Sequence, residues 1–153
     1  MLSGYHWPRA LRHTCFQAAV VLLTACSDPQ SPEQQVRDVI TGMQAAAEAR
    51  DAGNFMALIA SDFRNTEGQE FEDVQRYLRG YLLTHQSIHL LARIEQLEFP
   101  VAEEAHVSLA VGMAGEQVGG GSWDLAADLY EFDLVLREQD GDWKVINGAW
   151  RRR

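Results

Sequence analysis

The chain has 153 residues and a formal net charge of −9 at pH 7, with 13 lysines and arginines against 22 aspartates and glutamates. This acidic balance argues against a nucleic-acid-binding surface, for which a basic stripe is expected, and against adhesion to anionic lipid through charge. The length is sufficient for one folded domain.

The N-terminus carries a short apolar segment between basic residues and a cysteine. Arg9 and Arg12 precede the apolar run at 15–23 (CFQAAVVLL), which is well short of the roughly 20 residues that a membrane-spanning helix needs. Small residues then lead to Cys26 in the sequence LLTAC. This layout is typical of a secretory signal peptide.

The LLTAC sequence resembles the lipobox of bacterial lipoproteins. The resemblance implies a signal peptide over residues 1–25, cleavage before Cys26, a diacylglycerol on its sulfur, and an acyl chain such as palmitate on its new amino group. It further implies a lipid-anchored protein that faces the periplasm, and Ser27 is the residue type that permits transfer to the outer membrane in enterobacterial lipoproteins. The alternative is an ordinary cleavage site at which Cys26 is only a small residue.

Removal of the signal peptide changes the charge and the cysteine content of the mature chain. Without Arg9 and Arg12, 11 basic residues face 22 acidic ones, which gives a net charge of −11. Cys15 leaves with the signal and Cys26 is expected to be acylated, so no disulfide is expected. The domain must therefore be held together by its apolar core.

Residues 26–31 are expected to form the lipidated cysteine and a tether, and residues 32–153 a single domain. Ser31 is a predicted N-cap, followed by Pro32 at the first helical position and by Gln34, which would complete a capping box. Apolar residues recur at helical spacing from Val36 onward. The expected helices are a first one that ends at Gly53, a short second one capped by Asn54 and ended by Ser61 and Asp62, and a third over 71–84. The apolar face of the third helix is expected to consist of Val74, Tyr77, Leu78, Tyr81 and Leu82.

The apolar period changes from 3.6 to 2 at Ser87. A change of phase at Glu95 and Gln96 predicts a β-bulge. The Asp140-Gly141 pair predicts a hairpin into the last strand. Further strands are expected over 105–113 and 129–136, with a glycine-rich loop over 115–122. The basic chain end over 151–153 is expected to be solvated. Its alternative is a set of salt bridges to acidic neighbours or lipid headgroups. Helices followed by an antiparallel meander indicate an α+β domain.

This order of elements resembles the NTF2-like superfamily, including its SnoaL-like members. The resemblance is carried by the turn at 51–55, the segment at 58–63, and the terminal DGDWKVINGAW hairpin. It implies a cone in which three N-terminal helices pack on a curved antiparallel sheet. The superfamily includes steroid isomerases, polyketide cyclases, dehydratases and transport adaptors, so the fold does not select a function.

An enzyme on this scaffold needs a general base inside the cone, with its pKa adjusted by an apolar pocket. Asp62, Glu131 and Asp133 are the candidate bases, and Tyr130, Asn147 and Trp150 are the candidate pocket residues. The alternatives are that Asp62 ends a helix and that Glu131 and Asp133 lie on a solvent-facing sheet surface. The opposite face of their strand, which carries Tyr130, is the more apolar one and is expected to pack on the first helix.

The histidines are the other titratable candidates. His85 is expected to end the third helix, and His89 and His106 are expected to face solvent. Their spacing does not match a metal site, and no nucleotide or phosphate motif is present in the sequence, so no metal and no cofactor are expected.

Three functions are compatible with these observations. The first is a non-catalytic envelope lipoprotein that binds a protein partner or a small hydrophobic ligand. The second is an isomerase, cyclase or dehydratase that uses a pocket carboxylate as its base. The third is an assembly role through the open sheet face or Trp123, with a homodimer as one form of it.

Overall fold

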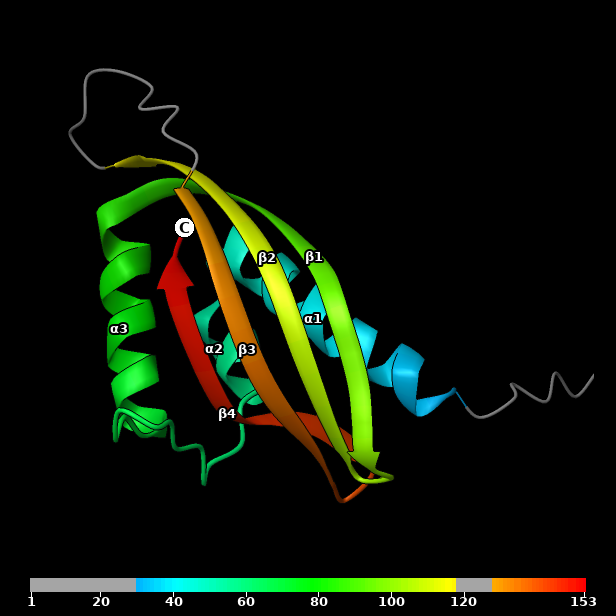
Figure 1. The fold of residues 1–153 in the computed structure, drawn as a ribbon. Helices are drawn as coiled ribbons and strands as arrows, with labels where there is room; N and C mark the ends of the chain where they lie inside the picture. Colours follow the sequence, from blue (N-terminus) through cyan, green and yellow to red (C-terminus); the bar gives the residue numbers. More distant parts are fainter. Residues whose placement is uncertain (1–29, 118–127) are drawn as a thin grey trace, which may run out of the picture.

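A computed structural model describes residues 30–117 and 128–153. The helices are α1 (Pro32–Glu48), α2 (Ala52–Ala57) and α3 (Phe71–Thr84), and the strands are β1 (His85–Val101), β2 (Glu104–Gln117), β3 (Asp128–Gln139) and β4 (Asp142–Arg152). The strands form one antiparallel sheet in the order β1-β2-β3-β4, and the sheet curves around the helices (Figure 1). The predicted α+β order of helices followed by a meander is confirmed. In the described part of the chain, no helix is long and apolar enough to cross a membrane.

The first helix begins as its sequence predicts. Ser31 is the N-cap and its hydroxyl accepts a hydrogen bond from the Gln34 backbone N–H at 3.3 Å, with Pro32 following. The reciprocal half of the capping box is not formed, because the Gln34 side chain donates to Asp38 at 2.8 Å. The helix also ends at Glu48, before the predicted stop at Gly53.

The second helix differs from the prediction at both ends. Its N-cap is Asp51, whose carboxylate accepts hydrogen bonds from the backbone and side-chain nitrogens of Asn54 at 3.0 and 2.7 Å. It ends at Ala57 because the following residues pair with β4: the Val145 N–H donates to the Leu58 carbonyl, and the Ala60 N–H donates to the Val145 carbonyl, both at 3.0 Å. A tertiary pairing thus replaces the last predicted turn.

The core lies between α1 and the concave face of the sheet. Val36 of α1 and Leu136 of β3 are both completely buried. Leu134 belongs to the same cluster and Phe132 packs against it, so this face of β3 faces the core that it shares with α1. The other members from α1 and the strands are Val39, Ile40, Ile88, Ala105, Val107, Leu109, Val111, Trp143 and Val145.

Two local predictions in the sheet are confirmed and one is wrong. The register shift between Ile94 and Gln96 is the predicted bulge, and Asp140 and Gly141 have the positive φ angles, 55° and 90°, that a tight hairpin requires. Gly115, however, lies in β2, which continues to Gln117. A Cβ at Gly115 would lie 2.7 Å from the Ser87 carbonyl oxygen, so glycine permits close strand pairing here. Residues 118–122 of the predicted loop, and Trp123 after them, lie outside the described residues.

The C-terminal arginines extend β4 and pair with acidic residues of β3. Arg151 contacts Glu131 and, at 3.5 Å, Asp133. Arg152 contacts Asp128, and Arg153 contacts Glu131. The chain end is exposed, as predicted, and its arginines also form the salt bridges with acidic neighbours that were the alternative.

Side chains of α1 cover part of the outer edge of β1. The Gln44 amide donates to the Leu90 carbonyl at 3.0 Å and accepts from the Ala92 N–H at 3.3 Å. The Glu48 carboxylate accepts from the Leu90 N–H at 2.8 Å. These contacts satisfy backbone groups that an edge strand otherwise leaves free for pairing with another chain.

Candidate functional site

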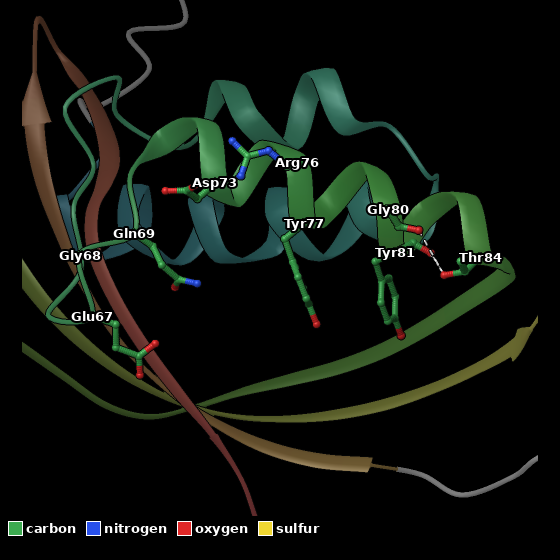
Figure 2. A pocket seen from close by; sticks show the side chains of 9 residues that line it. All are labelled: Glu67, Gly68, Gln69, Asp73, Arg76, Tyr77, Gly80, Tyr81 and Thr84. Carbon is green, nitrogen blue, oxygen red and sulfur yellow. Dashed lines mark hydrogen bonds and ion pairs between the residues drawn. The ribbon is translucent and has the colours of Figure 1, made fainter.

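An open groove of about 740 Å³ lies along the face of α3 that is turned toward the opening of the cone. Figure 2 shows Tyr77 and Tyr81 projecting from this helix toward the sheet. One end of the groove is formed by the loop before α3, which contributes Glu67, Gly68 and Gln69. The helix contributes Asp73, Arg76, Tyr77, Gly80, Tyr81 and Thr84.

Aromatic rings form a column along the groove. Tyr77 and Tyr81 are four residues apart and therefore share a helix face, with ring centroids 6.5 Å apart and an interplanar angle of 22°. The ring of His85, at the start of β1, stacks on Tyr81 at 4.0 Å. Tyr77 is 69% exposed, so it is not a core residue and offers its ring to a ligand.

A second aromatic row lies on the concave face of the sheet. The rings of Tyr130 and Phe132 in β3 are 6.3 Å apart, and Phe132 lies 6.3 Å from Trp150 in β4. Burial raises the pKa of Tyr81 above its ordinary value, and the nearby Tyr77, Tyr130 and Asp128 raise that pKa further.

The positive charges around this opening are paired. The Arg76 guanidinium lies 2.9 Å from the Asp73 carboxylate, and Arg152 contacts Asp128. The pKa of the Asp73 carboxyl lies below its usual range. The largest cause is the hydrogen bond that this carboxylate accepts from the Glu70 backbone N–H, and the contact with Arg76 lowers the pKa further. The Glu67 carboxylate forms no ion pair with a described residue. The charged groups that line the groove therefore sum to a negative charge.

Gly80 lies in the interior of α3 and lines the groove. A Cβ built at this position would meet no heavy atom within 4 Å, so close packing does not require a glycine here. Glycine in a helix interior is less favourable than alanine by about 1 kcal/mol. The residue therefore lowers helix stability while leaving the groove wall without a side chain.

His85 Nδ1 lies close to two oxygens, the Tyr81 carbonyl at 2.9 Å and the Thr84 hydroxyl at 3.1 Å. The carbonyl accepts hydrogen bonds and cannot donate them, and the Thr84 hydroxyl donates to the Gly80 and Tyr81 carbonyls. In the neutral ring the proton is therefore on Nδ1, and the lone pair is on Nε2. This arrangement leaves Nε2 able to accept a proton.

The three candidate bases lie outside the groove. Asp62 follows α2 on the surface, where its carboxylate accepts from the Gln139 side chain at 3.5 Å. Glu131 and Asp133 lie on the face of β3 opposite the core, and both contact Arg151. The Ser108 hydroxyl also donates to Asp133 at 2.7 Å. The structure therefore places these two carboxylates together, but on the outer face of the sheet.

The three candidate pocket residues are divided between the two sides of the sheet. Tyr130 and Trp150 belong to the concave aromatic row. Asn147 donates to the Arg64 carbonyl at 2.6 Å and borders a smaller cavity of about 300 Å³, which Asp133 and His106 also line. His106 and His89 are exposed, as predicted.

The sequence prediction missed the main groove residues. Tyr77 and Tyr81 were predicted as part of the buried face of the third helix, whereas Tyr77 is exposed. Their spacing, with Gly80 between them, was the available signal. No group of three histidine, cysteine, aspartate or glutamate side chains among residues 30–117 and 128–153 is arranged to hold a metal ion.

Comparison with known proteins shows the fold. No family model matches the sequence, and no curated protein matches it. A scytalone dehydratase-like protein from Novosphingobium aromaticivorans superposes with a TM-score of 0.69 at 13% identity, over 79% of this chain and 83% of that one. The hexachlorocyclohexane dehydrochlorinase LinA-type3 from Novosphingobium barchaimii gives 0.63 at 17%, over 79% and 86%. A ketosteroid isomerase-like protein from Erwinia carotovora gives 0.64 at 12%, over 78% and 94%. The domain is thus an α+β cone of the NTF2-like fold, as predicted.

Proposed function

We propose that this chain is a lipid-anchored envelope protein whose domain binds a small hydrophobic ligand with a ring, in the groove along α3. The observation that carries the proposal is the exposed aromatic column of Tyr77 and Tyr81 beside a position, Gly80, that has no side chain. Rings of this kind provide large apolar contact area at low entropic cost, and stacking between rings favours a flat ligand.

The groove suits a small molecule in size and composition. Ligand cavities of about 300–1,000 Å³ with mainly apolar walls and a few polar groups are typical of small-molecule sites. The volume of about 740 Å³ lies within that range, and polar groups are concentrated at the Glu67 end. A protein partner is the alternative occupant of the groove. A homodimer that forms through the outer face of the sheet is a further alternative function.

The ligand can be tested with 1-naphthol as the probe. The full chain is solubilised in dodecyl maltoside and dialysed against a reservoir of known naphthol concentration, so that partitioning into detergent does not change the free concentration. Gly80→Leu should lower the affinity at least about tenfold, because the new side chain fills part of the groove. Arg79→Leu is the matched control, because Arg79 is the exposed neighbour that does not line the groove. Equal affinities in the two variants, or no binding to the wild type, would refute the proposal.

The anchor is supported by the order of basic residues, apolar run, small residues and Cys26. Several acyl chains, each CH₂ contributing about 0.8 kcal/mol when buried, would make attachment effectively permanent. Ser27 favours the outer membrane as the location. Labelling with radioactive palmitate tests this part of the proposal: the wild type should be labelled and sediment with outer membranes, and Cys26→Ser should do neither. An unlabelled wild type would contradict the anchor.

Proton transfer on a bound ring is a second candidate function, and His85 is the observation that favours it. Its Nδ1 is held by the Tyr81 carbonyl, which leaves Nε2 as an acceptor beside the aromatic column. The ring ketone 2-tetralone is a suitable probe, because exchange of its α-hydrogens in D₂O reports proton abstraction. The protein should accelerate exchange and His85→Gln should remove the acceleration. Exchange at the rate of the buffer would exclude this function for that class of ligand.

A further inference from the structure

The charges around the groove show which kind of ligand it favours beyond a flat ring. Arg76, the one arginine among the described lining residues, is already engaged with Asp73 at 2.9 Å, and Arg152 contacts Asp128. An anionic ligand would therefore have to compete with a carboxylate for either arginine. The groove offers an anion no free cation among its described lining residues.

An unpaired negative charge lies at one end of the same groove. Glu67 lines it, and its carboxylate makes no hydrogen bond or ion pair with a described residue, since only its backbone N–H is engaged, by Asn65 at 3.0 Å. Figure 2 shows this carboxylate at the loop end of the groove, with the ring of Tyr77 projecting beyond it.

The aromatic column supplies ring faces that attract a cation. The faces of tyrosine rings carry negative electrostatic potential and attract cations that lie within about 6 Å of the ring centroid. Tyr77 is the most exposed ring of the column and neighbours Tyr81 at 6.5 Å. The whole chain also has a net charge of −9, so its long-range field attracts cations and repels anions.

Resting on the proposed function, we infer that the groove binds a small organic cation, an amine or quaternary ammonium group attached to an apolar or aromatic body. The cationic group lies against the faces of Tyr77 and Tyr81 on the side of Glu67, and the apolar body extends along the wall left open by Gly80. The specificity for charge comes from three features of the same groove: exposed ring faces, one unpaired carboxylate and paired arginines.

Two isosteric probes isolate the positive charge. Phenyltrimethylammonium and tert-butylbenzene have the same shape and differ in the quaternary nitrogen, and 4-tert-butylbenzoate supplies the opposite charge. The full chain in dodecyl maltoside is dialysed against each probe at known concentration, and amide chemical shifts of α3 locate the contact. We expect phenyltrimethylammonium to bind about 2- to 30-fold more tightly than tert-butylbenzene, and the benzoate to bind most weakly.

Charge-neutral variants then assign the effect to the groove. Glu67→Gln should weaken binding of phenyltrimethylammonium several-fold and leave tert-butylbenzene unchanged. Glu72→Gln removes the same charge from an exposed residue of α3 that does not line the groove, so it should change neither affinity. Tyr77→Leu should weaken the cation more than the neutral probe.

Each outcome decides between the two proposals. If phenyltrimethylammonium binds no more tightly than tert-butylbenzene, or if Glu72→Gln weakens it as much as Glu67→Gln does, the cation inference is overturned while the hydrophobic site stands. If neither these probes nor 1-naphthol changes the amide chemical shifts of α3, the proposed function itself fails.

Discussion

Replacement of Gly80 by alanine tests whether this position is kept open for a ligand or needed for packing. The new methyl group would meet no heavy atom within 4 Å, so no steric cost is expected. Alanine is favoured over glycine in a helix interior by about 0.8–1.0 kcal/mol, and Gly80 lies well inside α3. The free energy of unfolding should therefore rise by about 1 kcal/mol, and the melting temperature by roughly 2–8 °C.

Gly148 provides a control of opposite sign. A Cβ at this buried position would lie 2.9 Å from Leu134 Cδ2 and 3.8 Å from Phe63 Cε2, inside the core. Overpacking of this kind typically costs about 1–3 kcal/mol. Gly148→Ala should therefore lower the free energy of unfolding, although the same methyl group is added.

Urea unfolding followed by circular dichroism measures both variants by linear extrapolation. The reasoning requires that Gly80→Ala moves the midpoint to higher urea and Gly148→Ala to lower urea, with unchanged slopes. If Gly80→Ala is destabilising by 1 kcal/mol or more, this face of α3 is closely packed and does not border an open groove.

Three further variants test the core, the sheet edge and the buried phenol. Leu136→Ala, at a side chain with no exposed surface, should lower the free energy of unfolding by about 2–5 kcal/mol in urea titration, and a loss below 1 kcal/mol would contradict its place in the core. Gln44→Leu leaves two backbone groups of β1 without partners and should lower the free energy of unfolding by about 1–3 kcal/mol. Sedimentation velocity should also show more self-association, because the edge of β1 is then free to pair with another chain. Wild-type stability together with unchanged sedimentation would exclude the edge-covering role. Because the pKa of Tyr81 is raised in the folded state, its contribution to stability is complete below the ordinary pKa of 10.0 and is lost as the pH rises through the folded pKa. In urea titrations, Tyr81→Phe should therefore lose less stability than the wild type as the pH rises above 10.0. Identical pH profiles of the two proteins would show that Tyr81 is not responsible.

Local patterns in the sequence predicted much of the fold. Ser31 and Pro32 define the start of α1 through chemistry that lies within one helical turn. The phase change at Glu95 and Gln96 predicted the bulge, because alternate residues of a strand face opposite sides. The end of α2 was mispredicted because Leu58 pairs with Val145, which lies far away in the sequence.

The groove was harder to predict than the fold, because apolar spacing does not show which residues of a helix face a cavity. Tyr77 and Leu78 are adjacent members of the same predicted apolar face, yet Leu78 is buried and Tyr77 is 69% exposed. Neighbouring residues of a helix point about 100° apart, so Leu78 enters the core while Tyr77 lies beside the groove. For Glu131 the strand face could be inferred from the stronger apolar character of the opposite face, but its arginine partners depend on the register of β4.

Native mass spectrometry of the protein extracted from its own envelope membranes tests most directly whether the groove along α3 holds a small organic ligand in the cell. A bound small molecule is expected on the wild type and on Arg79→Leu, and it should be absent from Gly80→Leu. A wild-type protein without any adduct, or an adduct retained equally by Gly80→Leu, would contradict a ligand in this groove.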